Sequence, residues 1–262
     1  MLYKSAGFSK SGRFKAEILI LVFIIINMQT KYTEALQPEK YYHIYNRGNN
    51  GDNLFYRKSN YEYFLKKIDE YLSDFLIVHA FCLIPNHFHL LVEIKSDKEI
   101  IETIFTKEKY KKLLSKNLPD LQNDNKSARF LKSGRFNRET DENLSKILSK
   151  QFSYFFISYS KSINKQENRR GSLFEKPFKR KSINSEEYYR YLIYYIHHNP
   201  VHHGLRDDYS NYQWSSYKRI LSKKASKLPK QRIISEFDNK ENYIYYHSQE
   251  HDAEKYKDII ID

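Results

Sequence analysis

Two histidines separated by one bulky apolar residue, His87-Phe88-His89, have the types and spacing to hold a metal ion. From His87 to Ile94 apolar residues recur at every second position, which is the period of a half-buried strand. Successive strand side chains point to opposite faces, so both imidazoles are expected on one face. Two neutral imidazoles on a rigid backbone supply half of a divalent-metal site.

The histidine pair alone leaves its role open. The chain has ten histidines among 262 residues, so a close pair can arise by chance and be merely buried or exposed. A zinc site would need two further Cys or His ligands, and Cys82 is the single cysteine in the sequence. By itself, therefore, the pair is about equally well explained as a metal site and as two ordinary histidines with no metal role.

Hydrophobic periodicity and turn residues predict the elements around the pair. The run from Phe75 to Ile84 is strand-like and Pro85-Asn86 predicts a tight turn, so the pair should begin the second strand of a hairpin. A first strand is expected at residues 41–45. Helices are expected at 60–72 after the cap Ser59, in a short segment after the cap Asp97, at 143–163 and near 214–221.

A further helix, beginning after Ser185 and stopped by Pro200, carries a second group of candidate residues. Its period places Tyr195 and Asn199 one turn apart on the same face. The same stripe includes Tyr188 and Tyr191. From periodicity alone, Tyr195 is better explained as a core residue than as a functional one.

The charge balance predicts a polyanionic partner. Lys and Arg number 45 against 32 Asp and Glu, a net charge of +13, which favours a nucleic acid or an anionic membrane surface. Aromatic residues make up 16% of the chain, and basic residues interleaved with aromatics suit single-stranded nucleic acid. The alternative is a biased genome composition that inflates both counts. A single cysteine excludes an intramolecular disulfide.

Residues 161–181 form a strongly basic segment, with eight Lys and Arg residues against two acids, Glu167 and Glu175. The cations flank the glycine turn at Gly171 and aromatic residues, which favours a phosphate-contacting surface over a solvated charged face. The candidate DNA contacts are Arg47, Lys161, Lys165, Arg169, Arg170, Lys176, Lys179, Arg180 and Lys181.

The sequence divides into three parts. Residues 1–38 are an N-terminal extension whose apolar run, Ile18 to Ile26, is too short to span a bilayer but has the length of a signal-peptide core. We favour a true start at Met28 over a membrane anchor. Residues 39–222 form the main domain, with a charged insertion at 106–142, and residues 223–262 are a polar tail.

Five ordered blocks of sequence together resemble the single-tyrosine HUH transposases, the family named after insertion sequence 200, and within it the REP-associated branch. The resemblance extends from Tyr41 to Leu221. No phosphate-cradling glycine loop is present in the sequence. The blocks are Tyr42-His43-Ile44-Tyr45-Asn46-Arg47-Gly48, residues 82–92 around the histidine pair, Gly171-Ser172-Leu173-Phe174, Tyr195-Ile196-His197-His198-Asn199-Pro200-Val201 and Trp214-Ser215-Ser216-Tyr217.

The resemblance implies an α+β fold of the ferredoxin-like HUH type, a central antiparallel sheet with helices packed mainly on one side. It implies that His87 and His89 bind Mg²⁺ or Mn²⁺ with Asn199 as a third ligand, and that Tyr195 is the nucleophile. The implied substrate is single-stranded DNA beside a hairpin, cut and rejoined through a 5′-phosphotyrosine without a nucleotide cofactor. The implied protein is cytoplasmic and acts as a monomer or homodimer.

The implied roles agree with general chemistry. A phenol with a pKa of ~10 is a poor nucleophile at neutral pH, and a divalent cation can orient the scissile phosphate and stabilise the leaving oxygen. Tyr194 and Tyr159 compete with Tyr195 for the nucleophile role. Two other kinds of protein remain open: a non-catalytic single-stranded nucleic-acid-binding relative, and a membrane-associated protein led by its N-terminal apolar run.

Overall fold

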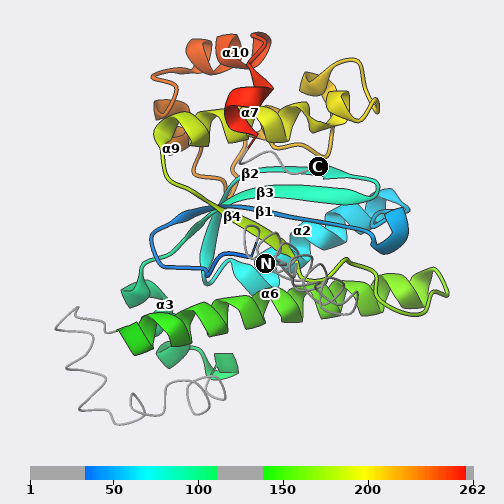
Figure 1. Ribbon diagram of the computed structural model, residues 1–262, viewed down its shortest axis with the longest axis vertical. Helices are drawn as coiled ribbons and strands as arrows, with labels where there is room; N and C mark the ends of the chain where they lie inside the picture. Colours follow the sequence, from blue (N-terminus) through cyan, green and yellow to red (C-terminus); the bar gives the residue numbers. More distant parts are fainter. Residues whose placement is uncertain (1–32, 111–137, 258–262) are drawn as a thin grey trace, which may run out of the picture.

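The computed structural model describes residues 33–110 and 138–257 (Figure 1). The apolar run at 18–26, Met28 and most of the expected insertion lie outside the described residues. Within the described part, no helix is both long and apolar enough to cross a membrane. The elements are β1 (Tyr41–Arg47), α2 (Lys58–Leu72), β2 (Leu76–Ile84), β3 (His87–Ile94), α3 (Asp97–Thr106), α6 (Arg138–Gln166), β4 (Lys179–Ile183), α7 (Glu186–His202), α8 (Tyr217–Leu221), α9 (Lys230–Ser235) and α10 (Lys240–Ser248), with short 3-10 turns at Asn49–Gly51, Glu108–Tyr110, Tyr209–Asn211 and Ala253–Tyr256.

The four strands form one antiparallel sheet in the order β2-β3-β1-β4. With α2 and α6 as the connecting helices, this is the β-α-β-β-α-β pattern of ferredoxin-like folds. The expected α+β class with a central antiparallel sheet is confirmed. The expected hairpin is confirmed as well, because β2 and β3 pair across the turn and His87 begins β3.

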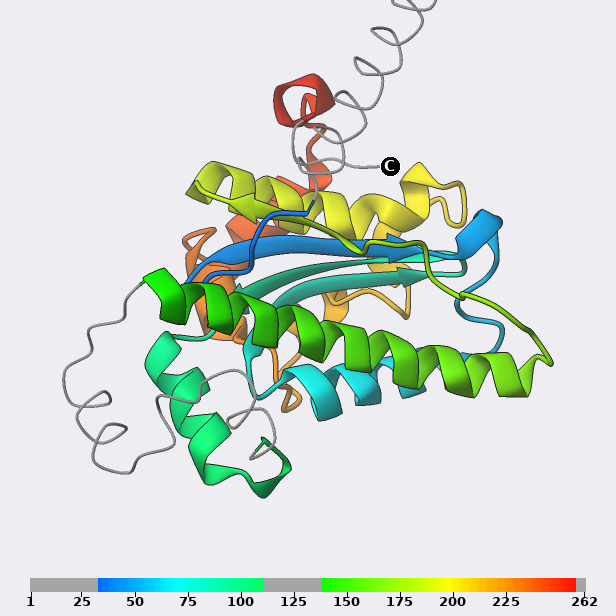
Figure 2. The same ribbon diagram turned by 60° about the horizontal axis from the view of Figure 1, so that its bottom comes forward.

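Helices cover both faces of the sheet, and not mainly one face as expected (Figure 2). Phe88, Leu90 and Val92 of β3 join a core cluster with α2 and α6. The alternate residue Leu91 joins a second cluster with α7. The reason is that the central strand is buried on both sides, so each face needs its own layer of packing.

Several helix ends differ from their predicted positions. Helix α2 begins at Lys58, and Asn60 rather than Ser59 stabilises its start, since Asn60 Oδ1 accepts hydrogen bonds from the backbone of residues 56 and 57. Ser96, one residue before Asp97, caps α3. Helix α7 continues to His202, because the ring of Pro200 removes one donor without blocking the last turn.

The C-terminal segment is folded onto α7, although its sequence predicts only a polar tail. Helices α9 and α10 lie beside α7 in Figure 1. Ile233, Phe237 and Tyr243 are buried in the same cluster as the apolar face of α7. A few apolar side chains spaced along three short elements are enough to anchor the segment, and no continuous helical stripe marks them in the sequence.

A chain of buried polar groups also ties this segment to α7 and the sheet. His197 Nδ1 lies 2.9 Å from Nε2 of His247, and His197 Nε2 lies 2.7 Å from Oγ of Ser216. The Ser216 hydroxyl oxygen accepts a hydrogen bond of 2.9 Å from the Phe81 backbone N–H of β2. The network therefore connects α10, α7 and the edge strand.

Stability should fall in mild acid because of His247. Burial lowers the pKa of His247 from 6.5 to about 3, so between these values the unfolded chain binds a proton that the folded chain does not. The free energy of unfolding is then expected to decrease by about 1 kcal/mol per pH unit below 6.5 from this group. Urea unfolding of the wild type and of His247→Gln at pH 7 and pH 5 measures this loss of unfolding free energy. An equal loss in the two proteins would contradict the prediction.

Candidate active site

The register of the sheet brings His43 and Tyr45 of β1 beside the histidine pair of β3. Tyr45 pairs with His89, and the side chains of directly opposed residues share a face, here the face covered by α7. His43 Nε2 lies 2.9 Å from His89 Nδ1. Burial, together with the neighbouring His43, lowers the pKa of His89 well below 6.5. His89 is therefore neutral at pH 7, the form that binds metals.

His87 is held between two asparagines. Its Nδ1 lies 2.8 Å from Oδ1 of Asn86, and its Nε2 lies 3.3 Å from Oδ1 of Asn199. The Asn199 amide nitrogen donates a 3.1 Å hydrogen bond to the Tyr195 carbonyl, which turns the amide oxygen towards His87. In the His87 tautomer that donates a hydrogen bond from Nδ1 to Asn86, Nε2 is an acceptor and faces a second acceptor, Oδ1 of Asn199. A cation bound between these two atoms would satisfy both.

The donor set fits a hard divalent cation. Mg²⁺ takes ligands at 2.0–2.1 Å in an octahedron, which places neighbouring donor atoms about 3 Å apart, close to the 3.3 Å between His87 Nε2 and Asn199 Oδ1. His89 uses Nδ1 towards His43, so it would bind through Nε2. Within the described ranges no group of three His, Cys, Asp or Glu side chains could hold a metal, so a site at the histidine pair would need the Asn199 amide as its third donor.

Tyr195 lies against the histidine cluster. Its ring centroid is 5.6 Å from that of His89 and 6.1 Å from that of His43, edge to face in both cases. Tyr195 sits one turn before Asn199 on α7, as the sequence predicts. Tyr191, expected on the same stripe, instead stacks on Tyr256 at 3.6 Å. Tyr195 is 2% exposed and belongs to the core cluster of α7, so it packs in that core and also lies against the histidine site.

The two competing tyrosines point elsewhere. The Tyr194 ring lies 4.1 Å from that of His198 and 4.5 Å from that of His251, towards the C-terminal segment. Tyr159 lies in the core on the opposite face of the sheet, where its hydroxyl donates to the Leu54 carbonyl at 2.8 Å. Of the three tyrosines weighed, Tyr195 is the one that the fold brings to the histidine pair.

Four residues of the site were missed by sequence reasoning. The Tyr45 ring stacks on His89 at 5.8 Å, and the His203 ring lies 4.4 Å from His87. Helical spacing could have identified His202 and His203, because they follow Asn199 by three and four residues and so lie on the same side of α7. No local signal marks the β1 residues, because their placement depends on strand pairing. The four residues are His43, Tyr45, His202 and His203.

The candidate DNA contacts do not share one surface. In β4, Lys179 and Lys181 pair with Tyr45 and His43 and so lie on the face of the histidine pair. Arg180 lies between them on the opposite face, where its guanidinium donates to the backbone carbonyls of residues 33 and 34. Lys179 Nζ sits 5.3 Å from the Tyr45 ring centroid, which adds positive charge beside the site.

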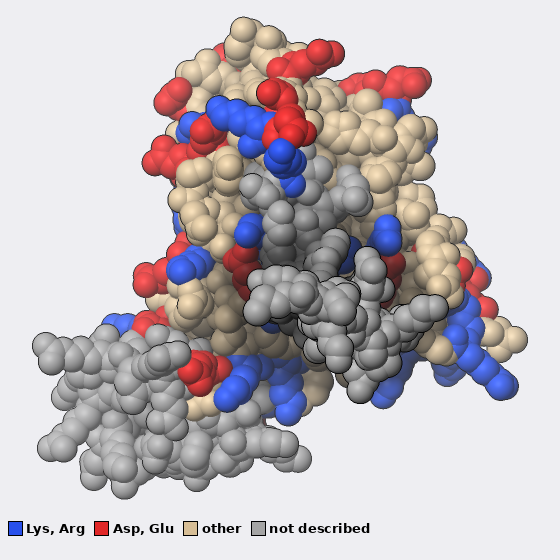
Figure 3. Space-filling view, in the orientation of Figure 1, with Lys and Arg blue, Asp and Glu red and all other residues tan. Residues whose placement is uncertain are grey.

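The remaining candidates gather near the end of α6 and the loop after it. Arg47 pairs with Glu175 at 2.6 Å, and Arg169 pairs with Asp52. In Figure 3 the lower right edge of the molecule is mostly blue, whereas the upper part carries both colours. The exposed candidates in this region are Arg47, Lys161, Lys165, Arg170 and Lys176.

Comparison with known proteins gives one structural likeness. No protein-family model and no curated protein matches the chain. The structure is similar to a solved structure described as the REP-associated tyrosine transposase bound to a REP hairpin, with a TM-score of 0.43 and 15% sequence identity. The match covers 73% of this chain and 84% of that chain.

Proposed function

We propose that this protein is a transposase-type enzyme that cuts and rejoins single-stranded DNA through a covalent bond to Tyr195. One observation carries the proposal: helix α7 presents Tyr195 and Asn199 together to the histidine pair, with Asn199 Oδ1 3.3 Å from His87 and the Tyr195 ring 5.6 Å from His89. A nucleophile and three metal donors on rigid elements are what metal-assisted phosphoryl transfer requires.

The chemistry assigns each residue a task. The Tyr195 hydroxyl attacks the scissile phosphorus and loses its proton, and the bond to the 3′-oxygen breaks, leaving a 5′-phosphotyrosine and a free 3′-hydroxyl. His87, His89 and Asn199 would hold Mg²⁺ or Mn²⁺, which supplies positive charge to the phosphate and the leaving oxygen. Attack by a 3′-hydroxyl reverses the step and joins two strands. The phosphotyrosine linkage conserves the energy of the broken phosphodiester bond, so rejoining needs no nucleotide cofactor.

The substrate we propose is single-stranded DNA beside a hairpin, handled by a monomer or homodimer in the cytoplasm. Support comes from Lys179 and Lys181, which lie on the same face of the sheet as the site; Lys179 lies over the Tyr45 ring, and Lys181 is in an ion pair of 2.7 Å with Glu34. Such cations neutralise phosphates without reading sequence.

The test is the covalent adduct itself. Hairpin-flanked single-stranded DNA labelled at its 3′ end, on the fragment whose 5′ phosphate becomes linked to Tyr195, is incubated with the protein and Mg²⁺ or Mn²⁺, then denatured and separated on a gel. A labelled band at the combined mass of the protein and that fragment, which disappears with a chelator, is expected. Binding without any adduct in either metal would remove the enzyme assignment.

A second candidate is a protein that binds single-stranded nucleic acid without turnover. The 2% exposure of Tyr195 favours it, because a scissile phosphate must reach the hydroxyl. The adduct assay separates the two candidates, since a binding protein gives retention of the labelled DNA and no covalent band.

Asn86 should act on the metal through His87. Its side-chain oxygen lies 2.8 Å from His87 Nδ1, a contact that orients the ring. Asn86→Ala is expected to weaken Mn²⁺ binding by about 10- to 100-fold, measured by electron paramagnetic resonance of free Mn²⁺. The control is Asn184→Ala at an exposed position before α7. An Asn86→Ala affinity equal to that of the control would disprove the positioning role.

A further inference from the structure

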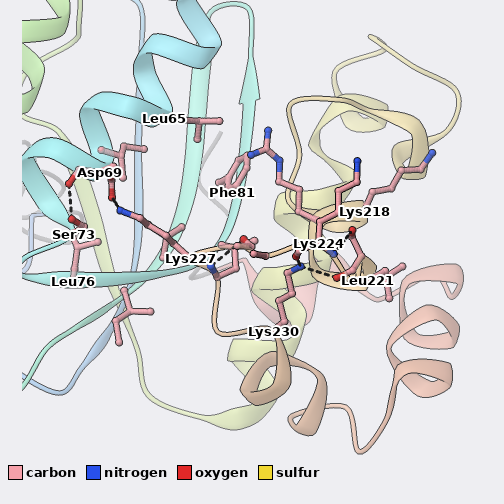
Figure 4. Close-up of a pocket in the computed structure, with 18 of the residues that line it drawn as sticks. Leu65, Asp69, Ser73, Leu76, Phe81, Lys218, Leu221, Lys224, Lys227 and Lys230 are labelled. Atoms are coloured by element: carbon pink, nitrogen blue, oxygen red, sulfur yellow. Dashed lines mark hydrogen bonds and ion pairs between the residues drawn. The ribbon is translucent and has the colours of Figure 1, made fainter.

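A second basic site lies along the edge strand β2, away from the histidine pair. A cavity of about 1120 Å³ opens between β2, α2 and the chain from α8 to α9, and we call it the edge pocket. Figure 4 shows Leu65, Asp69 and Leu76 on one side and Lys224 and Lys230 on the other. This volume is at the upper end of the range for pockets that bind small molecules, so the pocket can hold an extended ligand.

The edge pocket carries a large excess of positive charge. Six lining residues are cations, and Asp69 is the one acid among the lining residues; it pairs with Lys227. The partners of other lysines are neutral groups: Lys95 donates to the Ser73 carbonyl at 2.8 Å and Lys230 to backbone carbonyls. The lining residues of the pocket therefore keep a net charge of +5, from six cations and the single acid Asp69. The six cations are Lys95, Lys218, Arg219, Lys224, Lys227 and Lys230.

The rest of the edge pocket is apolar and aromatic. Ile68, Val78 and Leu228 line it, together with the Phe81 ring. The Arg219 guanidinium lies 5.1 Å above that ring, a cation–π contact. Cations beside an apolar and aromatic floor match an unpaired nucleotide, whose phosphate and base need different surroundings. A duplex hides its bases, and a flat bilayer surface does not enter a concave pocket.

The edge pocket and the candidate active site lie near opposite ends of strand β2, so one nucleic-acid strand could contact both. Strand β2 runs from Leu76, in the pocket, to Ile84, which pairs with His87. Eight steps at about 3.3 Å each separate these residues by roughly 26 Å. Because Leu65 and Ile68 of α2 line the pocket and the histidine pair lies on the α7 face, a nucleic-acid strand that occupies both places must pass around the β2 edge of the sheet.

We propose that the edge pocket binds an unpaired flank of the nucleic-acid substrate, with phosphates on Lys218 and Lys224 and a base against the exposed Arg219 guanidinium, which covers the buried Phe81 ring. The flank lies outside the cleavage site and contributes affinity, not chemistry. The inference rests on the proposed function for the identity of the strand, but its binding test does not depend on cleavage.

The test compares two pairs of charge reversals. Lys218→Glu with Lys224→Glu changes exposed residues of the pocket, and Lys98→Glu with Lys240→Glu changes exposed lysines outside it by the same total charge. Binding of a fluorescein-labelled oligothymidine, long enough to span both sites, is measured by anisotropy over a range of salt. The pocket variant is expected to bind about tenfold or more weakly, with a salt slope reduced by about 1 to 2. The control pair should bind like wild type.

Each outcome is decisive. Equal affinities of the pocket variant and the control overturn the inference. Loss of binding to phosphatidylglycerol vesicles without loss of oligothymidine binding also overturns it and assigns the pocket to a membrane. At saturating DNA the pocket variant should still form the Tyr195 adduct. If wild type forms no adduct while the pocket variant binds weakly, the proposed function fails and the inference stands.

Discussion

Replacing Tyr195 with Phe is expected to abolish the DNA–protein adduct and to lower strand cleavage by at least about a thousandfold. The substitution removes the attacking oxygen and keeps the ring that packs edge to face on His89 at 5.6 Å. DNA affinity should stay near the wild-type value, because the cations beside the site are unchanged. The free energy of unfolding should change by no more than about 1 kcal/mol, the usual contribution of one hydroxyl.

The neighbouring tyrosines provide matched controls for this substitution. Tyr194→Phe removes a hydroxyl from the adjacent residue of α7, whose ring faces His198. Tyr45→Phe tests the second tyrosine that contacts His89, which stacks on it at 5.8 Å. Both variants should keep the adduct. An adduct that persists in Tyr195→Phe and disappears in Tyr45→Phe would move the nucleophile from α7 to β1.

Replacing either histidine of the pair with Ala should remove metal-dependent cleavage, by about a hundredfold or more for each. His87→Ala deletes the donor 3.3 Å from the Asn199 oxygen, and His89→Ala deletes the more buried of the two histidines. The reason is that a site with three protein donors becomes a site with two, which binds the cation weakly. Cleavage rates over a Mn²⁺ titration, with Mn²⁺ binding measured separately, distinguish lost affinity from lost chemistry.

The stability of these two variants should differ, and that difference is itself informative. His89 is 1% exposed and its Nδ1 lies 2.9 Å from His43, so His89→Ala leaves a buried polar group of His43 without this contact. The expected cost is about 1 to 3 kcal/mol, whereas His87, at 9% exposure, should cost less. His251→Ala is the control for loss of a histidine outside the site. Undiminished cleavage in His87→Ala would rule out the metal role.

Local patterns were sufficient to predict the histidine pair and the helix that faces it. Alternation over β3 places His87 and His89 on one face, and helical spacing on α7 places Tyr195 and Asn199 one turn apart. Both relations join residues a few positions apart, and strand and helix geometry alone determine them. The hairpin was predictable for the same reason, whereas the α+β class with its central antiparallel sheet was expected from the resemblance of the five sequence blocks.

The basic segment shows where local information was misread. Lys179, Arg180 and Lys181 are consecutive in the sequence and were assigned together, but they form β4. Neighbours in a strand face opposite sides, so Arg180 lies on the far face from the two lysines. A strand prediction for residues 179–183 would have separated them.

Only the tertiary structure decided what surrounds the pair. Strand pairing across more than forty residues brings His43 and Tyr45 against His89, and no sequence pattern carries that register. Tyr159 lies away from the pair because α6 covers the opposite face of the sheet, whereas Tyr194 and Tyr195 share α7 and point to different sides of that helix. The folding of residues 230–256 over α7 depends on scattered apolar side chains that find partners far along the chain. Short-range periodicity therefore determined which residues share a face of a strand or helix, and long-range packing determined which of these faces meet.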